Sequence, residues 1–97
     1  MENDDLSWLL TWFNSQCDGD WEHCYGMRIT TINNPGWHIR FCLNETELED
    51  QQFQRIDVER SKEDWLNCYV ENGMFEGFCG PSNLHEILQI FHDWSKN

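Results

Sequence analysis

The stretch that decides the fold is residues 65–79, which read Trp-Leu-Asn-Cys-Tyr-Val-Glu-Asn-Gly-Met-Phe-Glu-Gly-Phe-Cys. Leu66, Cys68 and Val70 occupy every second position, and a period of two is typical of a strand with one buried face. The Asn-Gly pair at 72–73 is favoured in two-residue hairpin turns. A short further strand at residues 74–78 follows, so the stretch predicts an antiparallel hairpin.

Three more strands are predicted upstream of this hairpin. The period of two recurs in residues 27–31 and 37–43, and within residues 53–59 Ile56 and Val58 alternate with charged side chains, which is again the strand period. The polar residues 44–52, which include Glu45, Glu47, Glu49 and Asp50, are interpreted as a charged connection.

The first two of these strands are predicted to form a hairpin. Residues 33–36, Asn-Asn-Pro-Gly, are a turn signal. Placing both apolar sets on one face puts Asn33 opposite Trp37, across a three-residue loop in which Gly36 can take a positive φ.

Helical periodicity marks both ends of the chain. Residues 4–17 carry apolar side chains at helical spacing, and Asn83 can cap a second helix over residues 84–94, with Glu86 three positions later. In the first helix the recurring apolar side chains are Leu6, Leu9, Leu10 and Phe13, with Trp8 and Trp12 alongside. In the second helix the apolar stripe, which must face the sheet, consists of Leu84, Ile87, Leu88, Phe91 and Trp94. The sequence thus predicts a single α+β domain over residues 1–97, with an antiparallel sheet of four to five strands and both helices packed on one face.

The net charge restricts the classes of partner. Eighteen Asp and Glu against six Lys and Arg give a formal net charge of -12. Long-range repulsion at this charge disfavours nucleic acids and anionic membranes, and every apolar run is far shorter than the roughly 20 residues that span a bilayer. We expect a protein partner with a basic surface, and the alternative is that the charge serves solubility.

The cysteines indicate a reducing compartment. There are five, an odd number, and the first residues have neither the basic start nor the apolar run of a signal peptide. We therefore expect a cytoplasmic location. Cys79 lies just ahead of the second helix, whose N-terminus would lower the pKa of its thiol. A thiol-dependent enzyme of the sulfur-transfer type is thus an alternative function, and a buried, inert Cys79 is the simpler interpretation.

Residues 17–24, Cys-Asp-Gly-Asp-Trp-Glu-His-Cys, are dense in metal-ligand side chains. A calcium loop starting at Asp18 would need glycine at its sixth position and glutamate at its twelfth, where the chain has His23 and Ile29. A structural zinc site needs a second close-spaced pair of ligands, and no obvious pair follows downstream. We expect no metal and no cofactor, and interpret the segment as a solvated loop between helix and strand.

Acidic and aromatic residues are the candidates for contact with a partner. The acids of residues 18–22 flank a tryptophan in the most charge-biased part of the chain, and two further aromatic residues lie on the strand face opposite Leu66 and Val70. Trp and Tyr are enriched at interface hot spots, although each can instead pack in the core. The predicted partner-binding residues are Asp18, Asp20, Trp21, Glu22, Trp65 and Tyr69. The next candidate surface is the open sheet face that carries Arg28, Arg40, Trp65 and Tyr69.

Four segments together carry a resemblance that spans nearly the whole chain. They are Cys17-Asp18-Gly19-Asp20-Trp21-Glu22-His23 with Tyr25-Gly26; Asn34-Pro35-Gly36-Trp37; Asp64-Trp65 with Cys68 and Val70; and Asn83-Leu84-His85-Glu86-Ile87-Leu88 with Phe91 and Trp94. In these segments the chain resembles immunity protein 53, a family of small proteins associated with bacterial polymorphic toxin systems. The resemblance implies a cytoplasmic antidote, not an enzyme, that binds a cognate toxin and blocks it. We expect its acidic surface to occlude a basic toxin site; a protein-binding module unrelated to toxins is a further alternative.

Overall fold

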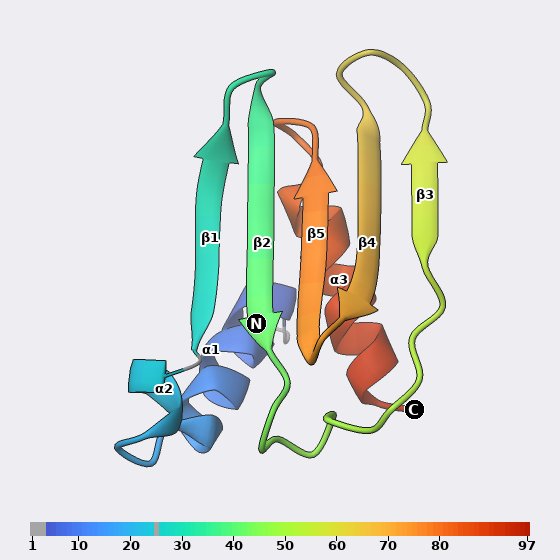
Figure 1. The fold of residues 1–97 in the computed structure, drawn as a ribbon. Helices are drawn as coiled ribbons and strands as arrows, with labels where there is room; N and C mark the ends of the chain where they lie inside the picture. Colours follow the sequence, from blue (N-terminus) through green and yellow to red (C-terminus); the bar gives the residue numbers. More distant parts are fainter. Residues whose placement is uncertain (1–3, 25) are drawn as a thin grey trace.

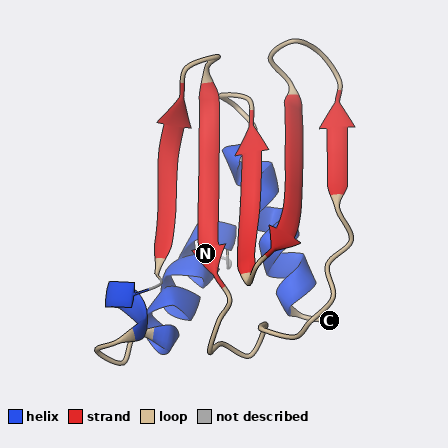
Figure 2. Cartoon of the chain, in the orientation of Figure 1, coloured by secondary structure: helices blue, strands red, loops and turns tan. Residues whose placement is uncertain are grey.

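The structure, a computed structural model, describes residues 4–24 and 26–97. One layer is a five-stranded antiparallel sheet in the order β1-β2-β5-β4-β3. The second layer consists of helices α1 (Asp5–Gln16) and α3 (Leu84–Ser95), which lie on the same face of the sheet (Figures 1 and 2). The predicted α+β architecture is confirmed.

The strands are β1 (Met27–Ile32), β2 (Gly36–Cys42), β3 (Ile56–Glu59), β4 (Trp65–Glu71) and β5 (Met74–Cys79). Residues 53–55, predicted to begin the third strand, lie outside β3. The predicted hairpin of β4 and β5 is confirmed, because its two turn residues, Asn72 and Gly73, have φ angles of 55° and 79°. Positive φ at both central residues is what a type I′ turn requires.

The predicted register of the first hairpin is wrong by two residues. Thr31, rather than Asn33, lies opposite Trp37, and the loop consists of residues 33–35. Gly36 is the first residue of β2 and is needed for close approach rather than for a positive φ: a Cβ there would lie 2.1 Å from a carbonyl oxygen of β5. Because the shift is an even number of residues, every side chain stays on its predicted face.

The core lies between the sheet and the two helices. Phe91 of α3 is at its centre, with ring centroids 4.9 Å from both Phe41 and Phe75 and 5.3 Å from Trp12 of α1. The predicted apolar stripe of α3 is confirmed at Ile87, Leu88, Phe91 and Trp94, which are buried. Each such side chain contributes about 1.5–3 kcal/mol when it is removed from water.

The prediction for α1 is only partly correct. Leu9 is buried, but Leu6 and Leu10 are 51% and 57% exposed. The reason is that Trp8 faces α3, where its ring stacks on His92 with centroids 4.2 Å apart. At about 100° per residue, positions 6 and 10 lie roughly 160° and 200° from Trp8 around the helix. Both leucines are therefore on the flank of α1 that faces away from α3.

The connection between β2 and β3 is attached to both helices. Leu48 is buried, the Trp12 indole donates a hydrogen bond to Glu47 (2.8 Å), and the Trp94 indole donates one to the Gln52 carbonyl (2.7 Å). The segment interpreted as a charged connection thus also completes the core. No described helix is both long and apolar enough to pass through a lipid bilayer.

Candidate functional site

One face of the sheet is left uncovered by the helices in the described part of the chain (Figures 1 and 2). We call it the open face. The strand alternation and the pairing registers place on it the side chains of Arg28, Thr30, Ile32, His38, Arg40, Asp57, Glu59, Trp65, Asn67, Tyr69, Glu71, Met74, Glu76 and Phe78.

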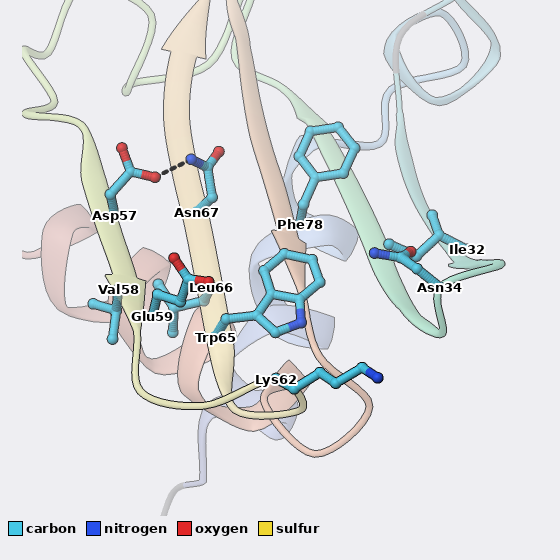
Figure 3. A pocket seen from close by; sticks show the side chains of 10 residues that line it. All are labelled: Ile32, Asn34, Asp57, Val58, Glu59, Lys62, Trp65, Leu66, Asn67 and Phe78. Carbon is cyan, nitrogen blue, oxygen red and sulfur yellow. Dashed lines mark hydrogen bonds between the residues drawn. The ribbon is translucent and has the colours of Figure 1, made fainter.

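An open groove of about 1010 Å³ lies at one end of the open face. Figure 3 shows Trp65 near the middle of the groove, Ile32 on the hairpin of β1 and β2 at one side, and Asp57 on β3 at the other. Phe78 of β5 lies between them, and Lys62 reaches in from the loop that joins β3 to β4. Aromatic anchors with a polar rim are the composition of protein–protein contact surfaces.

The aromatic ring of Phe78 is held in place by its neighbours. The His38 ring stacks on it with centroids 4.3 Å apart and an interplanar angle of 2°. His38 Nε2 lies 2.8 Å from one carboxylate oxygen of Glu76, and Arg40 Nε lies 3.1 Å from the other. This network orders the centre of the open face before any partner binds.

A second set of contacts orders the β3 side of the open face. The Arg55 guanidinium lies 4.7 Å from the centroid of the Tyr69 ring, a cation–π arrangement. Arg55 Nε also lies 3.2 Å from the Asp57 carboxylate, which accepts a further hydrogen bond from the side-chain amide of Asn67. Tyr69 is therefore positioned by a cation that is itself anchored.

Charge is distributed unevenly between the open face and the rest of the chain. Among the described residues, four of the Lys and Arg and four of the acids lie on or beside the open face, so the formal charges placed there cancel. The net charge of -12 therefore belongs to the rest of the chain. The cations are Arg28, Arg40, Arg55 and Lys62, and the acids are Asp57, Glu59, Glu71 and Glu76.

The predicted acidic loop has a structure of its own. Its second half forms a one-turn helix, α2 (Trp21–Cys24), where a loop was expected. The Asp18 carboxylate accepts hydrogen bonds from the backbone N–H groups of Asp20 (2.9 Å) and Trp21 (3.0 Å). The Glu22 carboxylate accepts them from Asp18 (3.0 Å) and Gly19 (2.9 Å). Two of the three predicted acids thus hold the loop together.

These hydrogen bonds favour the ionised carboxylates. The Trp21 amide, followed by that of Asp20, holds the pKa of Asp18 below its ordinary value. The pKa of Glu22 is lowered as well, first by its own backbone amide and then by those of Asp18 and Gly19. Asp20 is exposed at the loop surface.

Trp21 lies in the core. Its side chain is 2% exposed, with ring centroids 5.9 Å from Trp12 and 5.6 Å from Phe13. The alternative interpretation of Trp21, that it packs in the core, therefore agrees with its position. A side chain buried in this way cannot contact a partner. Its indole N–H has no hydrogen-bond partner among the residues placed by the structure.

The predicted site residues do not form a single cluster. Trp65 and Tyr69 share the open face on β4. Residues 18–22 lie instead beside the start of β1, at the end of the sheet opposite the groove (Figure 1). The structure therefore separates two candidate surfaces, an ordered aromatic face and an acidic loop.

A family model described as immunity protein 53 matches residues 6–96. The chain belongs to the immunity protein 53 family. Neither a curated protein nor a solved structure matches it. Membership confirms the resemblance noted in the sequence, and it supports an immunity role with a toxin as the general class of partner. Because the match includes both the open face and the acidic loop, it does not choose between them.

The position of Cys79 argues against the alternative function, in which this member of the immunity protein 53 family is a thiol-dependent enzyme. The side chain is 0% exposed, and burial raises the pKa of its thiol to about 11. At neutral pH only roughly one thiol in ten thousand is then ionised, and the thiolate is the nucleophile. The prediction that the helix N-terminus lowers the pKa of Cys79 is wrong, because desolvation of the thiol has the larger effect.

The predicted absence of a metal stays a prediction for this immunity protein 53 member. Within residues 4–24 and 26–97, no three His, Cys, Asp or Glu side chains converge as metal ligands would. Tyr25, which belongs to one of the segments that carry the family resemblance, lies outside the described residues.

Phe78 is the main residue of the open face that the sequence analysis missed. The two-residue period of β5 places it on the same face as Glu76. Its neighbours, His38 on β2 and Asn67 on β4, depend on which strands flank β5. The alternation could have identified its face, but only the strand order shows that it lies beside the groove.

Proposed function

We propose that this member of the immunity protein 53 family binds a cognate bacterial toxin directly through its open face and thereby blocks the toxin. The observation that carries the proposal is an uncovered sheet surface on which Trp65 and Phe78 line a groove and Tyr69 lies on the same face of β4. Trp, Tyr and Arg are the side chains that dominate binding energy at interfaces. Their existing contacts reduce the conformational entropy lost on binding.

The charge distribution supports a basic toxin as the partner. The net charge of -12 attracts a basic surface over long range and speeds association. The open face carries equal numbers of cations and acids, so it does not repel a basic surface once the two proteins meet. In this proposal the acidic surroundings guide the toxin, and the aromatic side chains retain it while its basic site is occluded.

The acidic loop contributes to guidance rather than to anchoring in this proposal. Asp20 is exposed, whereas Asp18 and Glu22 are engaged in hydrogen bonds within the loop. Asp20 is therefore the loop acid best placed to act on an approaching cation.

We place the complex in the bacterial cytoplasm. Cys17, Cys42, Cys68 and Cys79 are free thiols. Free thiols are the state that a reducing compartment maintains.

The proposal is tested by binding kinetics with the toxin encoded next to the gene of this chain. Trp65→Ala should raise the dissociation rate roughly 30-fold, since a hot spot contributes about 2 kcal/mol and each 1.4 kcal/mol is tenfold. Tyr69→Ala should act in the same direction. Gln89→Ala is the control, because Gln89 is exposed on α3, on the covered side of the sheet.

The guiding role of the loop is tested separately. Asp20→Lys should slow association and leave dissociation unchanged, and the wild-type association rate should fall as salt is added, because attraction is screened over about 8 Å at physiological ionic strength.

Trp65 and Tyr69 variants that fold and bind the toxin like wild type would exclude the open face as the interface.

A further inference from the structure

Asn83, which directly precedes α3, is the polar residue that the described chain buries most, with 6% of its surface exposed. A polar side chain is buried without a large cost only when its donors and acceptors find partners. The sequence predicts that Asn83 caps the helix, but in the described chain its side chain makes no capping hydrogen bond to α3. The buried amide therefore serves other groups.

The oxygen of this amide binds the start of β4. Asn83 Oδ1 accepts a hydrogen bond from the backbone N–H of Trp65 (3.3 Å). β5 ends at Cys79, the cross-strand partner of Leu66, so the strand pairing stops one residue short of Trp65. Beyond that point the Gly80 N–H donates to the Trp65 carbonyl (2.9 Å). Two groups from the segment between β5 and α3 thus hold the backbone of Trp65.

The nitrogen of the same amide is held by two carboxylates. Asn83 Nδ2 donates to Asp64 Oδ1 (2.9 Å) and to Glu86 Oε1 (3.3 Å). The Arg60 guanidinium binds both of these acids, at 2.7 Å from Asp64 and 2.6 Å from Glu86. Rotation of the amide would break hydrogen bonds at both of its ends, so its orientation relative to Trp65 is fixed.

The backbone of the loop before β4 is also tightly packed at this point. A Cβ on Gly80 would lie 2.2 Å from the backbone carbonyl oxygen of Glu63. The same loop carries Lys62, and Trp65 follows it near the middle of the groove (Figure 3). The contacts of Asn83 therefore lie directly behind the groove.

We propose that Asn83 is a positioning residue for toxin binding, which fixes the start of β4 so that the Trp65 indole stands in the groove before the toxin arrives. The inference rests on the proposed function, because Asn83 is buried and acts only through Trp65. The end of a strand frays more readily than its middle. A side chain that is already ordered loses less conformational freedom when it is bound, so fixing this strand end slows dissociation of the toxin.

A double-mutant cycle tests whether Asn83 acts through Trp65. Asn83→Ser removes the amide and leaves a residue type that favours the start of a helix. Toxin dissociation should become about three- to tenfold faster, an effect of the size found between neighbours in one hydrogen-bond network. In a Trp65→Ala background the same substitution should leave the dissociation rate unchanged. It should still lower the melting temperature there, because residue 65 keeps its backbone N–H.

Two further variants separate positioning from general stability. Ile87→Val is the control, because Ile87 is buried on the same helix and faces Gly77 of β5; it should lower stability without changing dissociation. Asp64→Ala removes one partner of the Asn83 amide. The Asp64 side chain is 47% exposed, so this variant should stay folded, and it should speed dissociation by a smaller factor than Asn83→Ser.

Fluorine NMR of the chain labelled with 5-fluorotryptophan examines the indole without any toxin. The Trp65 resonance, identified by its loss in Trp65→Ala, should shift or broaden in Asn83→Ser. The Trp21 resonance should stay in place, since Trp21 lies at the end of the sheet opposite the groove (Figure 1).

Three results would overturn the role of Asn83. They are toxin dissociation at the wild-type rate in Asn83→Ser, an equal acceleration by this substitution in the Trp65→Ala background, and an unchanged Trp65 resonance. Failure of the proposed function has a different sign, because Trp65→Ala and Tyr69→Ala would then themselves bind the toxin like wild type.

Discussion

Replacing Trp21 with alanine should destabilise the fold rather than impair toxin binding. The side chain is 2% exposed and packs against Trp12 and Phe13. Truncating a buried tryptophan costs about 3–5 kcal/mol, through lost burial and the cavity that remains. Single domains are stable by only about 5–15 kcal/mol. The substitution should therefore remove between a fifth and all of the free energy of unfolding.

Urea unfolding followed by circular dichroism measures this change. The midpoint for Trp21→Ala should fall, while the dependence on urea should stay close to that of wild type because similar surface is exposed on unfolding. Trp21→Phe keeps part of the ring and should lie between the two. The comparison variant is Trp65→Ala, whose side chain is only half-buried on the open face and whose truncation should therefore have the smaller effect on stability.

Toxin binding separates the two roles. Folded Trp21→Ala should dissociate from the toxin at the wild-type rate, whereas Trp65→Ala should dissociate faster. A Trp21→Ala variant within about 1 kcal/mol of wild-type stability would refute the reasoning, because that is far below the effect expected for a buried tryptophan. Faster toxin dissociation in that variant would return Trp21 to the role of a binding anchor.

Two further predictions concern pH and the buried thiol. Hydrogen bonds lower the pKa of Asp64, and the bond from Asn83 has a larger effect than the bond from Arg60. Hydrogen bonds from the same two residues lower the pKa of Glu86, and there the bond from Arg60 has the larger effect. A carboxyl group in the unfolded chain has a pKa of about 4. When its pKa is lower in the folded state, the ionised group stabilises the fold above about pH 4, and this stabilisation is lost as the pH falls through the folded-state pKa. The urea concentration at the unfolding midpoint should therefore fall as the pH is lowered below about 4.5. It should fall less steeply with pH in the double variant Asp64→Asn and Glu86→Gln. An unchanged dependence on pH in that variant would contradict the assignment. Native Cys79 should resist a thiol reagent at mildly alkaline pH and react on unfolding, and Cys79→Ser should keep toxin protection while losing about 1–3 kcal/mol through a poorly satisfied hydroxyl. Loss of protection in a Cys79→Ser protein that melts like wild type would revive the thiol-enzyme alternative.

Local patterns were sufficient for the elements of this fold. The period of two over residues 65–79 and the Asn-Gly pair predicted the hairpin of β4 and β5, because strand alternation and positive φ are properties of neighbouring residues. The helical stripe of α3 was predicted for the same reason. In the candidate site, the same alternation placed Trp65 and Tyr69 on the face opposite Leu66 and Val70.

Interactions between distant residues decided the rest. β5 inserts between β2 and β4, and this order brings Phe78 beside His38 and sets the groove. A backbone carbonyl of β5 leaves no room for a side chain at position 36, so this position requires glycine in the observed register of the first hairpin. Trp21 is buried because it packs against Trp12 and Phe13 of α1, whereas Leu10 is exposed because it lies on the flank of α1 that faces away from α3. The periodicity of a segment shows which residues share a face, but which face is buried depends on the element packed against it, and that element can come from anywhere in the chain.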